Sequence, residues 1–192
     1  MARGRGASYA AQVADLADAA VRVVERDGLP GLTFRMVAAE AGVSPGRVQH
    51  YFHTRKTLTS ATFRRVRELT QTRVERELSQ QDAATTPRDI IFATLRALIP
   101  TTTPQVSLFR VGQLVELHAA SDPELSTELR EGRTALVDFI AHQLMLAGRA
   151  GADARSEAIH AVATAEGLAS LTATGTISAA EALTLLERGE RT

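Results

Sequence analysis

Apolar residues recur three and four positions apart through most of the chain, as on one face of an α-helix, and no stretch alternates as a half-buried strand does. Residues 8–27, 55–81, 106–117 and 153–174 all carry this pattern, and clusters of Gly, Pro, Ser and Thr separate them. The segment 106–117 is apolar almost all round and is therefore expected to be central. The pattern predicts an all-α fold of about nine helices.

Residues 33–58 carry the densest set of helix start and stop signals. Thr33 and Ser44 can each accept a backbone N–H at a helix start, and Pro45 suits the first helical position. Gly42 between them can take the left-handed conformation that ends a helix. The stretch therefore predicts a helix-turn-helix, for which a helical hairpin of any other all-α protein is the alternative.

The second helix of this pair has two distinct faces. Val48 and Phe52 lie four residues apart and are predicted to be buried, while polar residues cover the opposite face. In DNA, phosphates accept hydrogen bonds from hydroxyl and cationic side chains, while guanine pairs with arginine and adenine with glutamine through two hydrogen bonds. On this basis Arg47 and Gln49 are predicted to specify the base sequence. The full set predicted to contact DNA is Thr33, Ser44, Pro45, Gly46, Arg47, Gln49, His50, Tyr51, Arg55 and Lys56.

The charge distribution agrees with one end that contacts phosphates. The 192 residues carry no net charge, but residues 1–65 hold ten basic and five acidic side chains, so the remainder is acidic. The N-terminus is expected to be a disordered basic arm leading into a helix from about Ser8 to Asp27. Arg3 and Arg5 in that arm can reach a minor groove, and an unstructured terminus without function is the favoured alternative.

Several of these residues resemble the signature of the TetR family of bacterial transcriptional regulators. They are Thr33, Val37–Ala38, Ala41–Ser44, Tyr51–Phe52, Arg55 and Leu58, and they cover the first third of the chain. The chain departs from the family's usual pattern at Gln49, where tyrosine is common, and at Arg55, where lysine is usual. The resemblance implies a one-component repressor that binds a near-palindromic operator as a dimer and leaves it when an effector binds.

The chain divides by function under this interpretation. Residues 1–54 form the predicted DNA-binding domain, a linking helix covers 55–81, and residues 55–192 form the predicted effector-binding and dimerisation domain. Independently of the resemblance, capping patterns place helix starts in the second part at Thr86, Ser121, Asp153 and Ser178.

Two segments in the second half, EGLASL around Glu166 and HAASDPELSTEL, resemble the BetI-type C-terminal domain within the TetR family. This resemblance implies that the last two helices pair with those of a second subunit in a four-helix bundle. An intramolecular core is the alternative for the same side chains. The interface candidates are Ile159, Val162, Glu166, Leu168, Leu171, Ile177 and Leu183.

The family resemblance also implies an effector pocket between the central helices. Its candidate lining is mostly apolar, which fits a medium-sized hydrophobic effector, and plain core packing is the alternative. The candidate lining residues are Phe92, Leu95, Phe109, Gln113, Phe139, His142 and Met145.

The composition excludes several kinds of chemistry. There is no cysteine, so the chain has neither disulfides nor a thiol nucleophile, and a reducing cytoplasm suits it. No apolar run is long enough to span a bilayer. His118, His142 and His160 are isolated and no catalytic motif is present, so we predict no enzyme activity, no metal and no cofactor. The alternatives are an effector-independent DNA-binding protein and a helical enzyme with an appended DNA-binding head.

Overall fold

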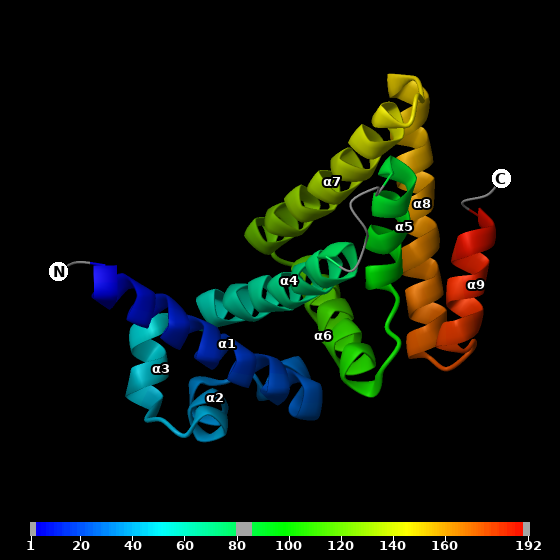
Figure 1. Cartoon of the computed structure of the whole chain (residues 1–192). Coiled ribbons are helices and arrows are strands. Elements are labelled where there is room, and N and C mark those ends of the chain that lie inside the picture. Colours follow the sequence, from blue (N-terminus) through cyan, green and yellow to red (C-terminus); the bar gives the residue numbers. More distant parts are fainter. Residues whose placement is uncertain (1–2, 80–85, 190–192) are drawn as a thin grey trace. The chain divides into compact units, whose positions relative to one another are not determined.

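The computed structural model describes residues 3–79 and 86–189, with side chains from Tyr9 onward. Within these residues all regular structure is helical, which confirms the predicted all-α class. The helices in chain order are α1 (Arg3–Gly31), α2 (Phe34–Ala41), α3 (Pro45–Tyr51), α4 (Arg55–Ser79), α5 (Pro87–Leu98), α6 (Thr103–Ala119), α7 (Pro123–Leu146), α8 (Gly151–Ala173) and α9 (Ala179–Gly189) (Figure 1).

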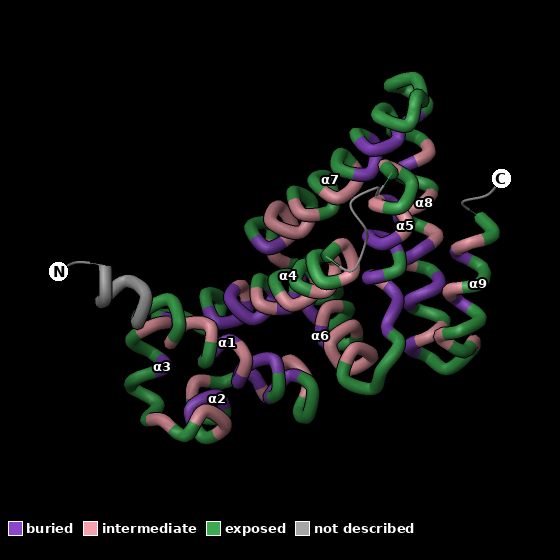
Figure 2. Tube along the Cα trace, in the orientation of Figure 1, coloured by how far each residue is buried: buried purple, intermediate pink, exposed green. Residues whose placement is uncertain are grey.

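The chain forms two compact units. The head unit comprises Met1–Leu69 with Arg110–Ser121, and the body unit comprises Thr70–Phe109 with Asp122–Thr192. In the head unit, α2 packs against both α1 and α3. Its core contains the side chains of Leu32, Val37, Val48 and Leu58, all fully buried. Figure 2 shows buried segments along α1, α2 and α4.

The helix-turn-helix of the head forms with the predicted caps. The Met36 N–H donates to the Thr33 hydroxyl at 3.2 Å, and the Arg47 N–H donates to the Ser44 hydroxyl at 3.3 Å. Gly42 lies between them in the left-handed conformation at φ 66°, where a β-carbon would be strained. The local signals of the sequence therefore determine this element by themselves.

The predicted start of α1 is wrong. The helix begins at Arg3 rather than near Ser8, so residues 3–7 of the predicted basic arm belong to α1, and residues 1–2 of the arm lie outside the described residues. Gly28 interrupts the helix at φ 68°, and a further turn containing Pro30 follows. The predicted end of the regular helix at about Asp27 is therefore confirmed, although the helical segment extends to Gly31.

Two predicted caps in the second half are also wrong. Asp122 caps α7, accepting from the N–H groups of Glu124 at 3.0 Å and Leu125 at 3.3 Å. The reason is Pro123, which takes the first helical position and leaves the residue before it as the cap. Helix α8 begins at Gly151 without a side-chain cap, so Asp153 lies inside its first turn, where a negative charge is favourable.

The helix α6 is less buried than its apolar sequence predicts. Val111 and Val115 are buried, but Leu114 and Leu117 are exposed, Leu117 by 75% of its surface. The apolar residues of this segment therefore do not all face a core of the described structure.

The body unit is built around α8, which contacts α5, α7 and α9 (Figure 1). Its core combines large side chains such as Ile91, Leu95 and Ile140 with a row of buried alanines on α8. Small side chains let neighbouring helices approach closely while leaving few voids. The alanine-rich composition of α8 therefore reflects packing inside one chain as well as any role between chains.

Candidate nucleic-acid interface

The helix α3 presents a polar face on an apolar base. Val48 is fully buried beneath it, and Phe52 at its C-terminal end is 4% exposed. Gly46, Arg47, Gln49 and His50 are all exposed. The structure thus places the predicted base-reading residues on the solvent face of a short helix whose other face is fixed in the head core.

A side chain from α1 holds two residues of α3. The Gln12 amide oxygen accepts hydrogen bonds from Arg47 Nη2 at 2.6 Å and from the Tyr51 hydroxyl at 2.5 Å. The ring of Tyr51 also lies 5.0 Å from that of Tyr9, between ring centres. Gln12 was not among the predicted site residues, because its partners are 35 and 39 positions away and no local pattern connects them. Gln12 orients Arg47 and Tyr51, both predicted DNA contacts.

Ion pairs fix α1 against α2 and α4. Glu40 accepts from Arg22 Nε at 2.7 Å and from Arg26 Nη1 at 2.9 Å, and these hydrogen bonds hold the pKa of its carboxyl below the ordinary value of 4.5. Asp18 receives two hydrogen bonds from Arg65, at 2.6 and 3.0 Å, and they raise the pKa of that guanidinium. Three of the basic residues counted in the head therefore neutralise acids of the head itself.

The start of α4 offers a second group of polar side chains. The Thr54 hydroxyl accepts from the Thr57 N–H at 3.1 Å and so caps the helix. Arg55 is exposed, and its Nη2 donates to the Leu29 carbonyl at 3.0 Å, which ties the α4 start to the last turn of α1. Arg55 thus has a structural contact in addition to its predicted contact with phosphate.

Arg35 is a further basic residue of the head that the predicted set left out. It lies in the first turn of α2, is exposed, and has no ion-pair partner in the described part of the chain. The sequence contains a signal for it, because Arg35 is the second residue of the helix that Thr33 caps. Arg35 therefore joins the cations that can meet a phosphate.

The region around this helix-turn-helix matches a known family model. Residues 16–62 match the model described as "Bacterial regulatory proteins, tetR family". These residues therefore carry the DNA-binding region of the TetR family. A curated relative, the HTH-type transcriptional regulator BetI of Burkholderia mallei, is 40% identical over 87 residues, which are 45% of this chain and 41% of that protein. The chain thus matches less than half the length of this curated TetR relative.

Solved structures extend the likeness to nearly the whole chain. A transcriptional regulator from Rhodococcus sp. Rha1 aligns with a TM-score of 0.79 at 25% identity, over 92% of each chain. A transcriptional regulator from Saccharomonospora viridis, solved in complex with choline, aligns with a TM-score of 0.76 at 16% identity, over 93% of this chain and 95% of that one. The second likeness shows the fold alone.

Some of the residues predicted for the dimer interface lie in the core of the body unit, and others lie on its surface. Ile159 and Leu171 on α8 are exposed by 49% and 42%. Glu166 pairs with Arg133 Nε of α7 at 3.3 Å. The candidates that lie in or against the body core of the same chain are Val162, Leu168, Ile177 and Leu183.

The effector-pocket candidates are spread over both units. Gln113 belongs to the head unit, is exposed and donates to Glu116 at 3.2 Å. In the body unit Leu95 is fully buried, Phe92 packs against the core and Phe109 is half-buried. The candidates with exposed side chains are Phe139, His142 and Met145.

Two features are absent from residues 3–79 and 86–189. No group of three or more His, Cys, Asp or Glu side chains there is placed to hold a metal ion. No helix among them has the length and apolar content needed to cross a membrane.

Proposed function

We propose that this protein is a one-component transcriptional repressor that binds a near-palindromic operator as a dimer. The observation that carries the proposal is the solvent face of α3, where Arg47, Gln49 and His50 project from a helix anchored by buried Val48. In this account residues 1–54 bind DNA, and residues 55–192 bind the second subunit and an effector. The named regulators among its relatives support it over the alternative of a helical enzyme.

The polar residues of the head divide into two kinds of DNA contact. Arg47 donates to guanine and Gln49 pairs with adenine in the major groove, each through two hydrogen bonds. Contacts to phosphate set the position of the protein on the duplex and make its affinity depend on salt. The residues we assign to phosphate contacts are Thr33, Arg35, Ser44, Tyr51, Arg55 and Lys56.

Exposed residues on α8 and α9 support the dimer. On α8, the exposed residues Ile159, Ala163, Gly167 and Leu171 recur every four positions and form a stripe. The small side chains in the middle of this stripe allow a second helix to approach closely. On α9, Leu185 is exposed by 42%. We assign these five residues to the contact with a second copy, because a helix-turn-helix protein reads two half-sites.

An effector completes the proposed mechanism. A ligand that binds the conformation unable to bind DNA shifts the equilibrium toward it and lowers operator occupancy. The choline complex of the Saccharomonospora viridis protein supports a ligand-binding body in this fold. An effector-independent DNA-binding protein is the competing account, and it predicts operator affinity that no small molecule changes.

Selection of bound duplexes from a random pool, at two salt concentrations, tests the proposal. The expected result is an inverted repeat with a fixed half-site spacing near one helical turn, retained at the higher salt. Weak binding that disappears with salt and enriches no motif would contradict a sequence-specific regulator.

A further inference from the structure

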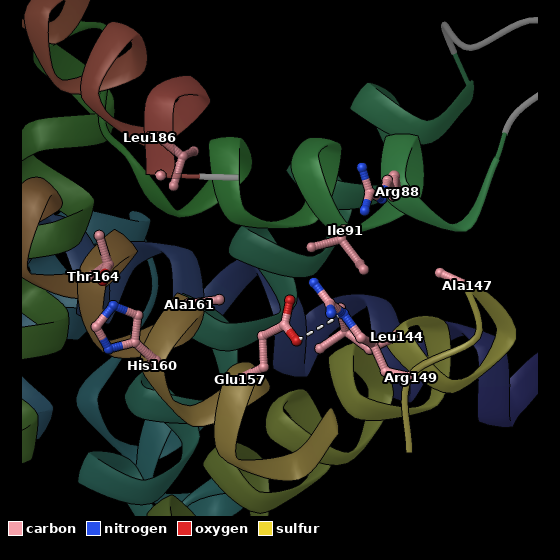
Figure 3. A pocket seen from close by; sticks show the side chains of 11 residues that line it. Arg88, Ile91, Leu144, Ala147, Arg149, Glu157, His160, Ala161, Thr164 and Leu186 are labelled. Carbon is pink, nitrogen blue, oxygen red and sulfur yellow. Dashed lines mark ion pairs between the residues drawn. The ribbon is translucent and has the colours of Figure 1, made fainter. Parts of the chain in front are cut away.

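A cavity of about 160 Å³ lies within the body unit, where α5, α8 and α9 meet the end of α7 (Figure 3). None of the predicted pocket or DNA-contact residues lines it. Apolar cavities of about 150 Å³ accept a molecule the size of benzene. This cavity is therefore large enough for a compact small molecule and too small for a bulky hydrophobic effector.

The inner wall of the cavity is apolar. Ile91 of α5, Leu144 of α7 and Leu186 of α9 line it, and each is at most 6% exposed. These three side chains belong to the packed core of the body unit, so the wall is rigid. A ligand with an apolar body gains free energy by covering this wall.

The rim of the cavity is polar and carries an excess of positive charge. Arg88 of α5 and His160 of α8 are exposed at the rim, and Figure 3 shows both side chains beside the cavity. Arg149 Nε pairs with the Glu157 carboxylate at 3.2 Å, so these two charges offset each other. Arg88 has no ion-pair partner in the described part of the chain, which leaves one uncompensated guanidinium at the rim.

The apolar wall and the positively charged rim determine which ligand charge the cavity can accept. A guanidinium donates two parallel hydrogen bonds to a carboxylate and remains charged at any physiological pH. A quaternary ammonium ligand needs the faces of Trp, Tyr or Phe around it, and none of these three residue types lines this cavity. A cation would also meet the like charge of Arg88.

We propose that this cavity binds a small carboxylic acid with a compact apolar body, with the carboxylate on Arg88 and the body against Ile91, Leu144 and Leu186. Benzoate has this chemistry and size. The site is a property of the body unit, so its existence does not depend on the DNA-binding function proposed above.

Calorimetric titration of the full-length chain with benzoate tests the site. Benzamide has the same shape without the charge and is the matched ligand, and choline is the cationic probe. We expect benzoate to bind, benzamide to bind about tenfold more weakly because the charge-assisted bonds are lost, and choline to give no signal. Equal binding of benzoate and benzamide, or no binding of benzoate, would overturn the proposal.

Variants locate the binding. Arg88→Ala removes a surface side chain and is expected to weaken benzoate about tenfold, while Ala161→Leu fills the cavity from α8 and is expected to abolish binding. Arg130→Ala is the control, because Arg130 is an exposed arginine of the same unit that lies outside the cavity. Thermal unfolding checks that each variant is folded, and Arg88→Ala decides the test if Ala161→Leu does not fold. Unchanged benzoate affinity in Arg88→Ala would place the binding elsewhere and refute the site.

Discussion

Replacing Gln12 with alanine removes a connection that the sequence pattern does not reveal. The variant deletes the amide oxygen that accepts from Arg47 at 2.6 Å and from Tyr51 at 2.5 Å. A guanidinium has five N–H donors, so Arg47 can keep its bond to Gln12 and still donate two others to a guanine. Gln12 is therefore expected to hold Arg47 ready for DNA rather than compete with DNA for it.

The size of the effect follows from the freedom that Arg47 regains. Immobilising one long side chain on binding costs about 0.5–1.5 kcal/mol, and a dimer immobilises two copies. The expected loss is about 1–3 kcal/mol, or about 5- to 150-fold in affinity for the operator. The free energy of unfolding of the head should fall by only about 1 kcal/mol, because these hydrogen bonds are partly exposed to water.

Fluorescence anisotropy with a selected duplex, repeated over a range of salt, measures this loss. The affinity of Gln12→Ala should fall while the slope of log affinity against log salt stays unchanged, because no cation leaves a phosphate. Gln71→Ala removes an exposed glutamine of α4 that pairs with Glu75, and it serves as the control. Unchanged or tighter binding by Gln12→Ala, or a shallower salt slope, would refute the positioning role.

Three other changes test separate parts of the structure. A β-carbon at Gly46 meets no atom within 4 Å, so Gly46→Ala should keep its thermal stability yet bind DNA about tenfold more weakly by crowding the groove; unchanged affinity would place Gly46 away from DNA. Hydrogen bonds from Arg22 and Arg26 lower the pKa of Glu40 below 4.5. The ionised Glu40 carboxylate therefore stabilises the fold fully at a pH above 4.5, and this stabilisation is lost as the pH falls through the pKa of the folded state. The melting temperature of Glu40→Gln should therefore fall less in acid than that of the wild type, and identical profiles of melting temperature against pH for the two proteins would contradict this. Ile159→Arg with Leu171→Arg should give monomers in sedimentation, whereas Leu146→Arg, a change at another exposed leucine, should not; a dimeric double variant would exclude this face.

Local signals made the head predictable. Thr33, Gly42 and Ser44 each act within three or four residues of their own position, so the caps and turn follow from the sequence alone. The start of α7 was missed by one residue because Ser121 and Asp122 both suit a cap, and the choice depends on Pro123. Where several signals agree within one turn, the sequence decides the structure.

Contacts between distant residues were not predictable in the same way. Gln12 is hydrogen-bonded to Arg47 and Tyr51, which follow it by 35 and 39 residues in the sequence. No periodicity of the sequence indicates these contacts. The same limit applies to α8, where apolar and small residues occur on every face. Only packing shows that Val162 and Leu168 face the body core while Ile159 and Leu171 face outward. The rim of the cavity likewise joins Arg88 of α5 to His160 of α8, which are far apart in the sequence.

The central claim is that the outer face of α3 reads a DNA sequence. The most direct measurement is selection from a random duplex pool, run in parallel with the wild-type chain and with Gln49→Ala. The account predicts an inverted repeat for both, with the same half-site spacing, and loss of base preference at one position of each half-site in the variant. An identical motif for both proteins, or no motif for the wild type, would contradict it.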